Sequence, residues 1–312
     1  MAEKKSLRVA YGEALAELAS QNDKIVAMDA DLSGATMTKI FKEAYPDRFF
    51  DFGIAENNMV CAAAGFAHSG LIPFVSTFAL FGAGRCYEMI RNSIAYVNAN
   101  VKFGFSHAGI SVGEDGGSHQ SFEDIALMRE IPGMTMFVPC DAVEMKKAVF
   151  AAAEIEGPVF IRISRPESDI ITNEKTTFVP GKANIMKDGS QVCIVATGLM
   201  VNEAMKAAKA LRDKDISAAV LNVHTIKPLD NETILRMANK CGAVVTAEEH
   251  SVLGGLGSAV AEVLAGNSNA KFARIGIQDR FGQSGTPAEL FDEYGLSSKF
   301  IVDKAVELVN AK

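Results

Sequence analysis

Short apolar runs and amphipathic segments alternate along the chain. Nearly uninterrupted apolar runs are typical of strands buried on both faces of a sheet, and apolar residues that recur every three to four positions are typical of helices. The predicted strands are 25–30, 49–54, 71–77, 101–107, 134–139, 158–164, 191–197, 216–223, 243–249 and 272–277. The predicted helices are 7–20, 56–69, 84–98, 123–129, 141–155, 201–213, 231–239, one after residue 258 and one from about 298. This alternation predicts an α/β fold with a parallel sheet, in which ligands bind beyond the carboxyl ends of the strands.

One long stretch interrupts the alternation. Residues 166–190 mix Pro, Gly, Thr and charged residues without sustained periodicity, which is typical of a connection between domains. We therefore predict a first domain over 1–168, a linker over 169–188 and a second domain over 189–312. The sequence GGLGS at 254–258 lacks the spacing of a dinucleotide-binding loop and is interpreted as a helix-opening turn rather than a phosphate cradle.

Composition excludes several classes of partner. The 312 residues are 48% hydrophobic and carry a net charge of −7 without long runs of one sign, so we expect neither nucleic acid nor a membrane as a partner. The N-terminus has no apolar segment typical of export, and no apolar run is long enough for a membrane helix. Five scattered cysteines without a CxxC pair favour the reducing cytoplasm.

A carboxylate interrupts the apolar, small-residue stretch 54–66. Glu56 falls where this stretch reads as a buried strand, turn and helix. Burial without a partner disfavours a charged carboxylate, so Glu56 could keep a proton and share it with a bound molecule. The alternative is a residue at a helix N-terminus, whose charge complements the helix dipole.

A glycine-rich loop at 106–120 holds two histidines and two carboxylates. His107 and His119 lie twelve residues apart, which is not a zinc-like pairing, and we expect no metal ligands in this chain. His119 is better interpreted as a proton shuttle or a hydrogen-bond donor to a developing alkoxide, and Asp115 as an acceptor from a substrate hydroxyl. Phe78 and Phe81 could be ordinary core residues, but their position between Glu56 and this loop favours stacking on a planar ligand.

Six motifs in this order resemble the transketolase family. They are DADL at 29–32, GIAENNM at 53–59, STFALF at 76–81, GEDGGSHQ at 113–120, PCD at 139–141 and SRP at 164–166. The resemblance covers essentially the whole chain, and it implies a thiamin-diphosphate-binding pyrimidine domain with a parallel sheet, followed by the transketolase C-terminal α/β domain.

The resemblance also implies roles for single residues. Glu56 would protonate or hydrogen-bond the pyrimidine ring of thiamin diphosphate, with His119 as a second catalytic residue. The implied cofactor contacts are Phe78 and Phe81, which stack on the aminopyrimidine, and Asp31. The implied substrate contacts are Asp115 and His119 for the sugar hydroxyls, and Arg8, His107 and Arg165 for the substrate phosphate.

The chain departs from the family pattern at three positions. Ala35 stands where transketolases usually have a serine that helps to bind phosphate, a role that Ser33 could take. Gly84 stands where a tyrosine commonly completes the pyrimidine pocket, and Cys61 where the pattern often has glycine.

A larger departure from the family pattern is that the chain lacks the diphosphate-binding half of a thiamin-diphosphate enzyme. Thiamin-diphosphate enzymes hold Mg²⁺ and the diphosphate with a GDG segment and a later Asn, and EDGG at 114–117 does not match that pattern. The chain therefore resembles the C-terminal subunit of a split transketolase. Its implied partner is an N-terminal subunit that carries the diphosphate-binding domain and Mg²⁺, in a two-plus-two heterotetramer that transfers a two-carbon ketol unit between sugar phosphates of pentose phosphate metabolism.

Three other functions are weighed against this one. 1-Deoxyxylulose-5-phosphate synthase and the beta subunit of a 2-oxo-acid dehydrogenase share the Glu-bearing helix, but the synthase usually has Asp in place of His107. A non-catalytic assembly subunit would have no need of a buried acid, an imidazole and a guanidinium directed at one cleft. Pentose, branched and sulfonated sugars all fit the implied anion site, and the resemblance assigns no role to the C-terminal domain.

Overall fold

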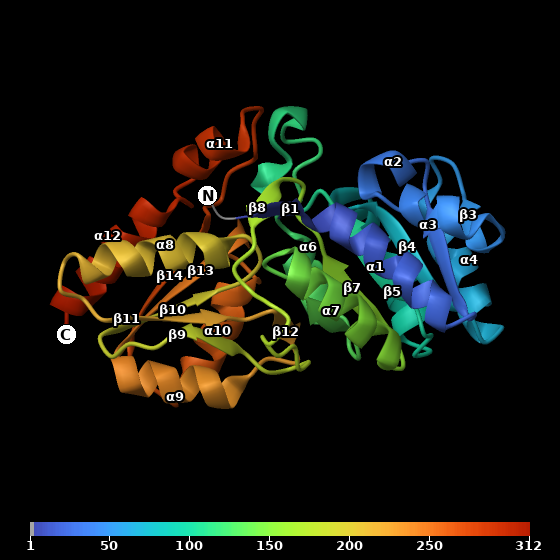
Figure 1. Cartoon of the computed structure of the whole chain (residues 1–312). Helices are drawn as coiled ribbons and strands as arrows, with labels where there is room; N and C mark the ends of the chain where they lie inside the picture. The colour runs from blue at the N-terminus through green and yellow to red at the C-terminus, as the bar shows by residue number, and fades with distance from the viewer. Residues whose placement is uncertain (1–2) are drawn as a thin grey trace.

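Two α/β units lie side by side in the computed structural model, which describes residues 3–312 (Figure 1). The first unit holds a seven-stranded sheet, and the second holds a five-stranded sheet. In each sheet the strands pair in parallel, apart from one antiparallel edge strand. The predicted α/β fold with parallel sheets is confirmed.

The strands of the first sheet are, in spatial order, β12 (Thr225–Lys227), β6 (Thr135–Phe137), β7 (Val159–Arg162), β5 (Lys102–Ser106), β4 (Ile72–Phe78), β2 (Ile25–Asp29) and β3 (Phe49–Asp51). The helices of this unit are α1 (Leu7–Gln21), α2 (Ser33–Thr36), α3 (Lys39–Ala44), α4 (Glu56–His68), α5 (Tyr87–Met89), α6 (Asp124–Glu130) and α7 (Ala142–Glu154). Short 3₁₀ segments are η1 (Pro46–Arg48) and η4 (Ile110–Asp115), and wider π-helical segments are η2 (Leu80–Arg85) and η3 (Ile90–Ala95).

Helices cover both faces of the first sheet, which explains its apolar strands. Every residue of β2, β4 and β5 is buried. Along β2, Ile25 and Ala27 join the core beneath α1 and α7, whereas Val26 and Met28 join the core beneath α4. Successive side chains of a strand point to opposite faces, so a strand covered on both sides is mostly apolar, and the buried polar residues Asp29 and Ser106 lie at strand ends.

The second sheet runs β14 (Lys271–Ile277), β13 (Ala243–Ser251), β10 (Val192–Ala196), β11 (Ala218–Asn222) and β9 (Asn184–Lys187). Helices α8 (Met200–Arg212) and α12 (Ser298–Asn310) cover one face, and α9 (Asn231–Cys241) and α10 (Leu256–Leu264) cover the other (Figure 1). The short helix α11 (Pro287–Glu293) lies against η4 of the first unit. The GGLGS turn opens α10, as predicted.

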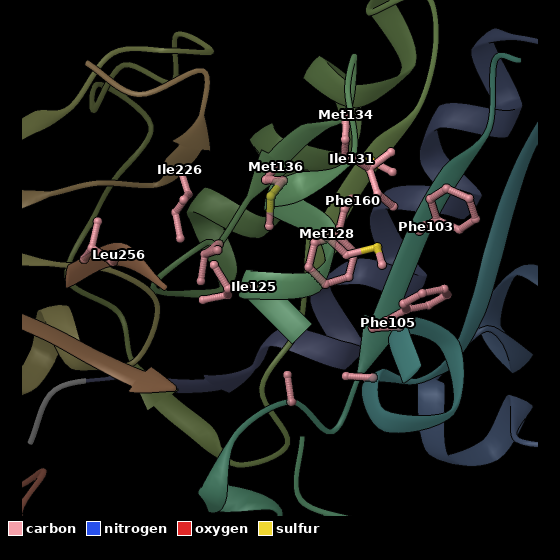
Figure 2. Packing of buried hydrophobic residues seen from close by; sticks show 14 of the residues in the cluster. Phe103, Phe105, Ile125, Met128, Ile131, Met134, Met136, Phe160, Ile226 and Leu256 are labelled. Atoms are coloured by element: carbon pink, nitrogen blue, oxygen red, sulfur yellow. The ribbon is translucent and has the colours of Figure 1, made fainter. Parts of the chain in front are cut away.

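The two units share a core. One buried cluster extends from Phe103 and Phe160 in the first sheet, through Met128, to Ile226 and Leu256 (Figure 2). Strand β12 follows the second unit's β11 in the chain, yet it pairs with β6 of the first sheet. The units are thus fastened to each other by both apolar packing and a strand pair.

Several short elements were not predicted from the sequence. β1 (Lys4–Ser6) pairs with β8 (Glu167–Asp169), and β9 lies inside the predicted linker and pairs with β11. Strands of three or four residues carry too little alternation to be recognised. The helix predicted at 84–98 begins earlier, at Leu80, because Gly82 and Gly84 weaken the helical signal at its start. Among residues 3–312, no helix combines the length and apolar character that crossing a membrane requires.

Candidate active site

Glu56 begins helix α4 and is buried, with 3% of its side chain exposed. Its Oε2 accepts a hydrogen bond from Arg85 Nη1 at 2.7 Å, and the Arg85 side chain is half exposed. The expectation of an unpaired carboxylate is therefore wrong, because the helical segment after β4 brings Arg85 back to α4. The sequence carries no signal for this pair, since its members lie 29 residues apart.

Four aromatic rings gather at the carboxyl ends of the neighbouring strands β4 and β5. Phe78 stacks on Phe81, with ring centroids 5.6 Å apart, and more closely on His107, at 3.8 Å. His119 meets Phe81 edge-on at 5.5 Å. The Arg85 guanidinium lies 5.0 Å from the centre of the Phe81 ring, so it connects these rings to Glu56. The structure thus brings together the predicted residues Glu56, Phe78, Phe81, His107 and His119.

His107 is a neutral imidazole in this position. It is buried, its φ of +57° is left-handed, and its Nδ1 shares a hydrogen bond of 2.9 Å with Ser106 Oγ. Burial lowers the pKa of His107 to about 3, and the positive charges of Arg8 and Arg165 act in the same direction. At neutral pH His107 can therefore offer an N–H or a lone pair to a ligand, but not a positive charge.

Arg8 and Arg165 line one cavity of about 340 Å³ between the two units. Arg8 Nη1 donates to the backbone oxygen of Ala35 at 2.6 Å, and Arg8 Nε donates to that of Arg165 at 3.2 Å. Burial lowers the pKa of Arg8, and the nearby Arg165 adds to this effect. Two guanidinium groups side by side make the cavity a candidate anion site. Ser33 is not among the described residues that line it.

Arg165 also has partners within the protein. Its Nη1 donates to the backbone oxygen of Val112 at 2.6 Å and pairs with Glu114 Oε2 at 2.9 Å. Both acceptors belong to η4, so Arg165 holds the segment that leads to Asp115 and His119. Glu114 is exposed, and an anionic ligand would compete with it for the guanidinium.

Asp31 and Asp115 do not join the ring cluster through any contact found among residues 3–312. Asp31 is exposed beyond β2, has a left-handed φ of +60°, and donates its backbone N–H to Asp51 Oδ1 at 3.0 Å. Asp115 is exposed at the end of η4. Both are open to a ligand, and neither is positioned by a side-chain partner in the way that Glu56 is.

Asp29, for which the sequence predicted no role, shapes the DADL turn. Its carboxylate accepts hydrogen bonds from Leu32 N at 2.6 Å, Thr36 Oγ1 at 2.7 Å and Thr38 Oγ1 at 2.9 Å. Burial raises the pKa of Asp29 to about 6, although these three bonds oppose the shift. Asp29 thus supports the backbone that presents Asp31.

The PCD motif has a structural role at the junction of the two units. Asp141 caps α7 through Glu144 N at 2.9 Å and also accepts from Ile171 N at 2.8 Å. Glu144 in turn accepts from Cys140 N at 2.8 Å and from Asn222 Nδ2 of β11 at 2.7 Å. The motif therefore attaches two parts of the chain to the first unit. One is the segment that connects the units, and the other is the second sheet. In the part of the chain that the structure describes, no group of three or more His, Cys, Asp or Glu side chains is arranged to hold a metal ion.

Two family models match the chain. The model of the transketolase pyrimidine-binding domain matches residues 3–169, and that of the transketolase C-terminal domain matches residues 181–301. The 6-deoxy-6-sulfo-D-fructose transketolase subunit SqwH of Clostridium sp. (strain MSTE9) is 44% identical over 98% of this chain and 95% of its own length. Transketolase of Homo sapiens is 39% identical over 98% of this chain, which spans only 49% of that protein.

A solved structure agrees with the sequence relatives. It is described as a split-gene transketolase, inactive beta4 tetramer, and it is 47% identical to this chain. The two structures superpose with a TM-score of 0.91 over 98% of each chain. The likeness therefore extends over both α/β units.

Proposed function

Since this chain belongs to the transketolase family, we propose that it is the C-terminal subunit of a two-part transketolase that transfers a two-carbon ketol unit between ketose and aldose phosphates. The transketolase family generally uses thiamin diphosphate. One observation carries the proposal: a buried carboxylate, Glu56, is joined through Arg85 to the stacked rings of Phe78, Phe81 and His107.

This group of residues fits the aminopyrimidine of thiamin diphosphate. A planar heterocycle needs aromatic faces against its ring and a polar group at its edge, and Phe78 with Phe81 and Glu56 have those properties. Glu56 would hold a proton against a ring nitrogen, once the half-exposed Arg85 guanidinium turns from the carboxylate toward solvent. When bound, thiamin diphosphate supplies the electron sink that cleavage of a carbon–carbon bond beside a carbonyl requires.

The remaining predicted residues, apart from Asp31, would hold the sugar. His119 and Asp115 lie on one loop and would bind the hydroxyls, with His119 also moving a proton. Arg8 and Arg165 would bind the phosphate in their shared cavity, and the neutral His107 would contribute one hydrogen bond. Asp31 would lie beside the cofactor, on the turn that Asp29 supports.

A second subunit would complete the enzyme. The chain spans about half of human transketolase, which supports a partner that carries the diphosphate-binding domain and Mg²⁺. We propose a two-plus-two heterotetramer, and the tetramer described for the split-gene relative supports self-association of this kind of subunit. We also propose that the enzyme acts in the cytoplasm, in pentose phosphate metabolism; the five free cysteines fit a reducing compartment.

The proposal is tested by purifying the chain with its partner subunit and assaying a panel of donors. The expected result is ketol transfer from xylulose 5-phosphate to an aldose phosphate. The panel should include 6-deoxy-6-sulfofructose, because the SqwH relative is named for it and two guanidinium groups suit a sulfonate as well as a phosphate. Release of CO₂ from pyruvate without ketol transfer would move the chain to the synthase or dehydrogenase group. No turnover of any donor by the assembled complex would favour a non-catalytic subunit.

Replacing Arg165 with Ala should separate phosphate recognition from catalysis. A charge-assisted hydrogen bond contributes about 1.5–3 kcal/mol, so KM for phosphorylated donors should rise by about ten- to a hundredfold. Turnover of hydroxypyruvate, which has no phosphate, should stay nearly unchanged. Steady-state kinetics with both donors measure the difference.

The matched control for Arg165→Ala is Glu114→Gln. This variant breaks the ion pair of 2.9 Å but retains the guanidinium, so KM for phosphorylated donors should not rise. Equal losses with both donors in Arg165→Ala would show that Arg165 acts by supporting η4 through Val112 and not by binding phosphate.

A further inference from the structure

A buried ion pair of the first unit lies beside the loop that carries Asp115 and His119, and it also contacts the second unit. Arg162, at the end of β7, donates through Nε to Asp124 Oδ2 at 2.6 Å and through Nη2 to Asp124 Oδ1 at 3.2 Å. The same Nη2 donates to the backbone oxygen of Glu249 in β13 at 2.9 Å. Both side chains of the pair are buried, with at most 3% exposed. Strand β13 is therefore held firmly beside the first unit.

From this strand, the Glu249 side chain reaches into the loop. Its Oε1 accepts a hydrogen bond from the backbone N–H of Ser111 at 2.6 Å, and the Glu249 residue is 2% exposed. Gly109 has a left-handed φ of +87°, and a Cβ at this position would overlap the Glu249 carboxylate. The loop backbone and the carboxylate are thus in direct contact, which only glycine permits.

A second contact holds the far end of the loop. Gln120 Nε2 donates to the backbone oxygen of Gln283, in the second unit, at 2.9 Å and to that of Gly113 at 3.2 Å. A Cβ at Gly117 would lie only 2.8 Å from the backbone oxygen of Gly282. The second unit therefore contacts the loop on both sides of Asp115 and His119.

We propose that Glu249 is a positioning residue: by accepting from Ser111 N–H, it lets the second unit hold the 109–120 loop in place over the active site. This inference rests on the proposed function, because it gives Asp115 and His119 their substrate-binding roles. The loop needs such support, since Gly109, Gly113 and Gly116 all have a positive φ and none of residues 109–120 belongs to a named strand. The C-terminal domain would thereby contribute to catalysis by positioning this loop.

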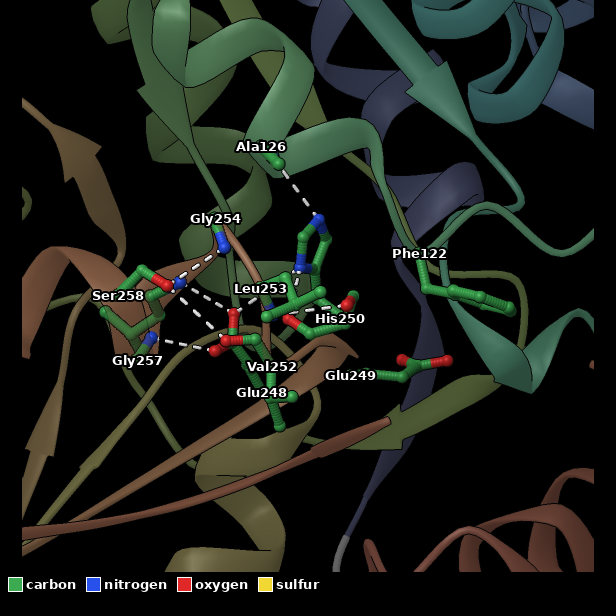
Figure 3. A network of polar contacts seen from close by, with 12 residues as sticks. Phe122, Ala126, Glu248, Glu249, His250, Val252, Leu253, Gly254, Gly257 and Ser258 are labelled. Atoms are coloured by element: carbon green, nitrogen blue, oxygen red, sulfur yellow. Dashed lines mark hydrogen bonds and ion pairs between the residues drawn. The ribbon is translucent and has the colours of Figure 1, made fainter. Parts of the chain in front are cut away.

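The neighbouring Glu248 provides a matched control. Its carboxylate accepts from Leu256 N at 2.6 Å and Gly257 N at 2.7 Å, and so caps the start of α10. Figure 3 shows the Glu248 carboxylate directed toward Gly257, whereas the Glu249 carboxylate is directed to the other side, toward Phe122. Both glutamates are buried in the same strand, yet only Glu249 contacts the loop.

Hydrogen–deuterium exchange on the purified chain tests the contact directly. Glu249→Ala should speed exchange of the Ser111 amide by about tenfold, because this amide loses its hydrogen-bond acceptor. Glu249→Gln retains an acceptor oxygen and should restore exchange to within about threefold of wild type. Glu248→Gln loses one of the two acceptor oxygens that Glu248 uses, so it should speed exchange at one of the Leu256 and Gly257 amides but not at Ser111. Unchanged exchange of Ser111 in Glu249→Ala, or a rise spread evenly over β13 and α6, would overturn the proposal.

Kinetics of the assembled two-subunit complex test the consequence for the site. Glu249→Ala should lower kcat/KM for ketol transfer by about tenfold or more, Glu249→Gln should recover most of it, and Glu248→Gln should match wild type. Wild-type kinetics in Glu249→Ala would overturn the positioning role. If the wild-type complex transferred no ketol unit, the proposed function would be wrong. The exchange experiment would still decide whether Glu249 holds the loop.

Discussion

Replacing Glu56 with Gln should lower turnover of the assembled enzyme by about 10²–10⁴, the usual contribution of a positioned general acid or base. Gln has nearly the shape of Glu and keeps an acceptor oxygen, but it cannot hold or move the proton at Oε2. Affinity for thiamin diphosphate should change by less than about tenfold, because the ring faces of Phe78 and Phe81 remain. Single-turnover kinetics and cofactor titration measure the two quantities separately.

The control for this variant must account for the ion pair between Glu56 and Arg85. Arg85→Gln breaks the same contact of 2.7 Å but leaves the acid in place, so it should retain most of the turnover. It should also lower thermal stability, because a buried carboxylate then loses its charged partner. Equal losses of turnover in Glu56→Gln and Arg85→Gln would show that Glu56 acts as half of a structural ion pair at the start of α4.

The isolated chain should bind thiamin diphosphate far more weakly than the two-subunit complex does. The proposed division of the site leaves the diphosphate and Mg²⁺ to the partner. Each charge-assisted contact to the diphosphate contributes about 1.5–3 kcal/mol, so the loss of several such contacts should weaken binding by about 10³ or more in Kd. Titration calorimetry should show no saturable binding to the chain alone below about 1 mM cofactor, and saturable binding once the partner and Mg²⁺ are present.

Two controls make this titration decisive. Thiamin without its diphosphate should bind the complex weakly. This result would show that the affinity which the isolated chain lacks comes from the diphosphate site. The Glu56→Gln complex should still bind the complete cofactor. Tight, Mg²⁺-dependent binding by the chain alone would contradict the two-part enzyme and would require a diphosphate site within this polypeptide.

The alternation of apolar runs and helical segments was sufficient to predict the fold. Parallel strands such as β2, β4 and β5 are buried on both faces, so each is a mostly apolar run that can be recognised in the sequence. The residues of the candidate site were also visible, because a Glu in an apolar stretch and two His in a glycine-rich loop have no simple role in packing. Their functional roles remain predictions.

The contacts that hold these residues in place became apparent only in the folded chain. The pairing of Glu56 with Arg85 joins two helical segments, and the stack of Phe78 on His107 joins two neighbouring strands, so neither follows from local spacing. The contact of Glu249 with Ser111 spans 138 residues and crosses from one α/β unit to the other. The longer helices and strands could be predicted from the sequence, since periodicity and burial act over a few neighbouring residues, whereas the short strands β1, β8 and β9 could not. Which charged and polar side chains pair with each other depends on how those elements pack, so these pairs follow from the folded chain and not from local sequence patterns.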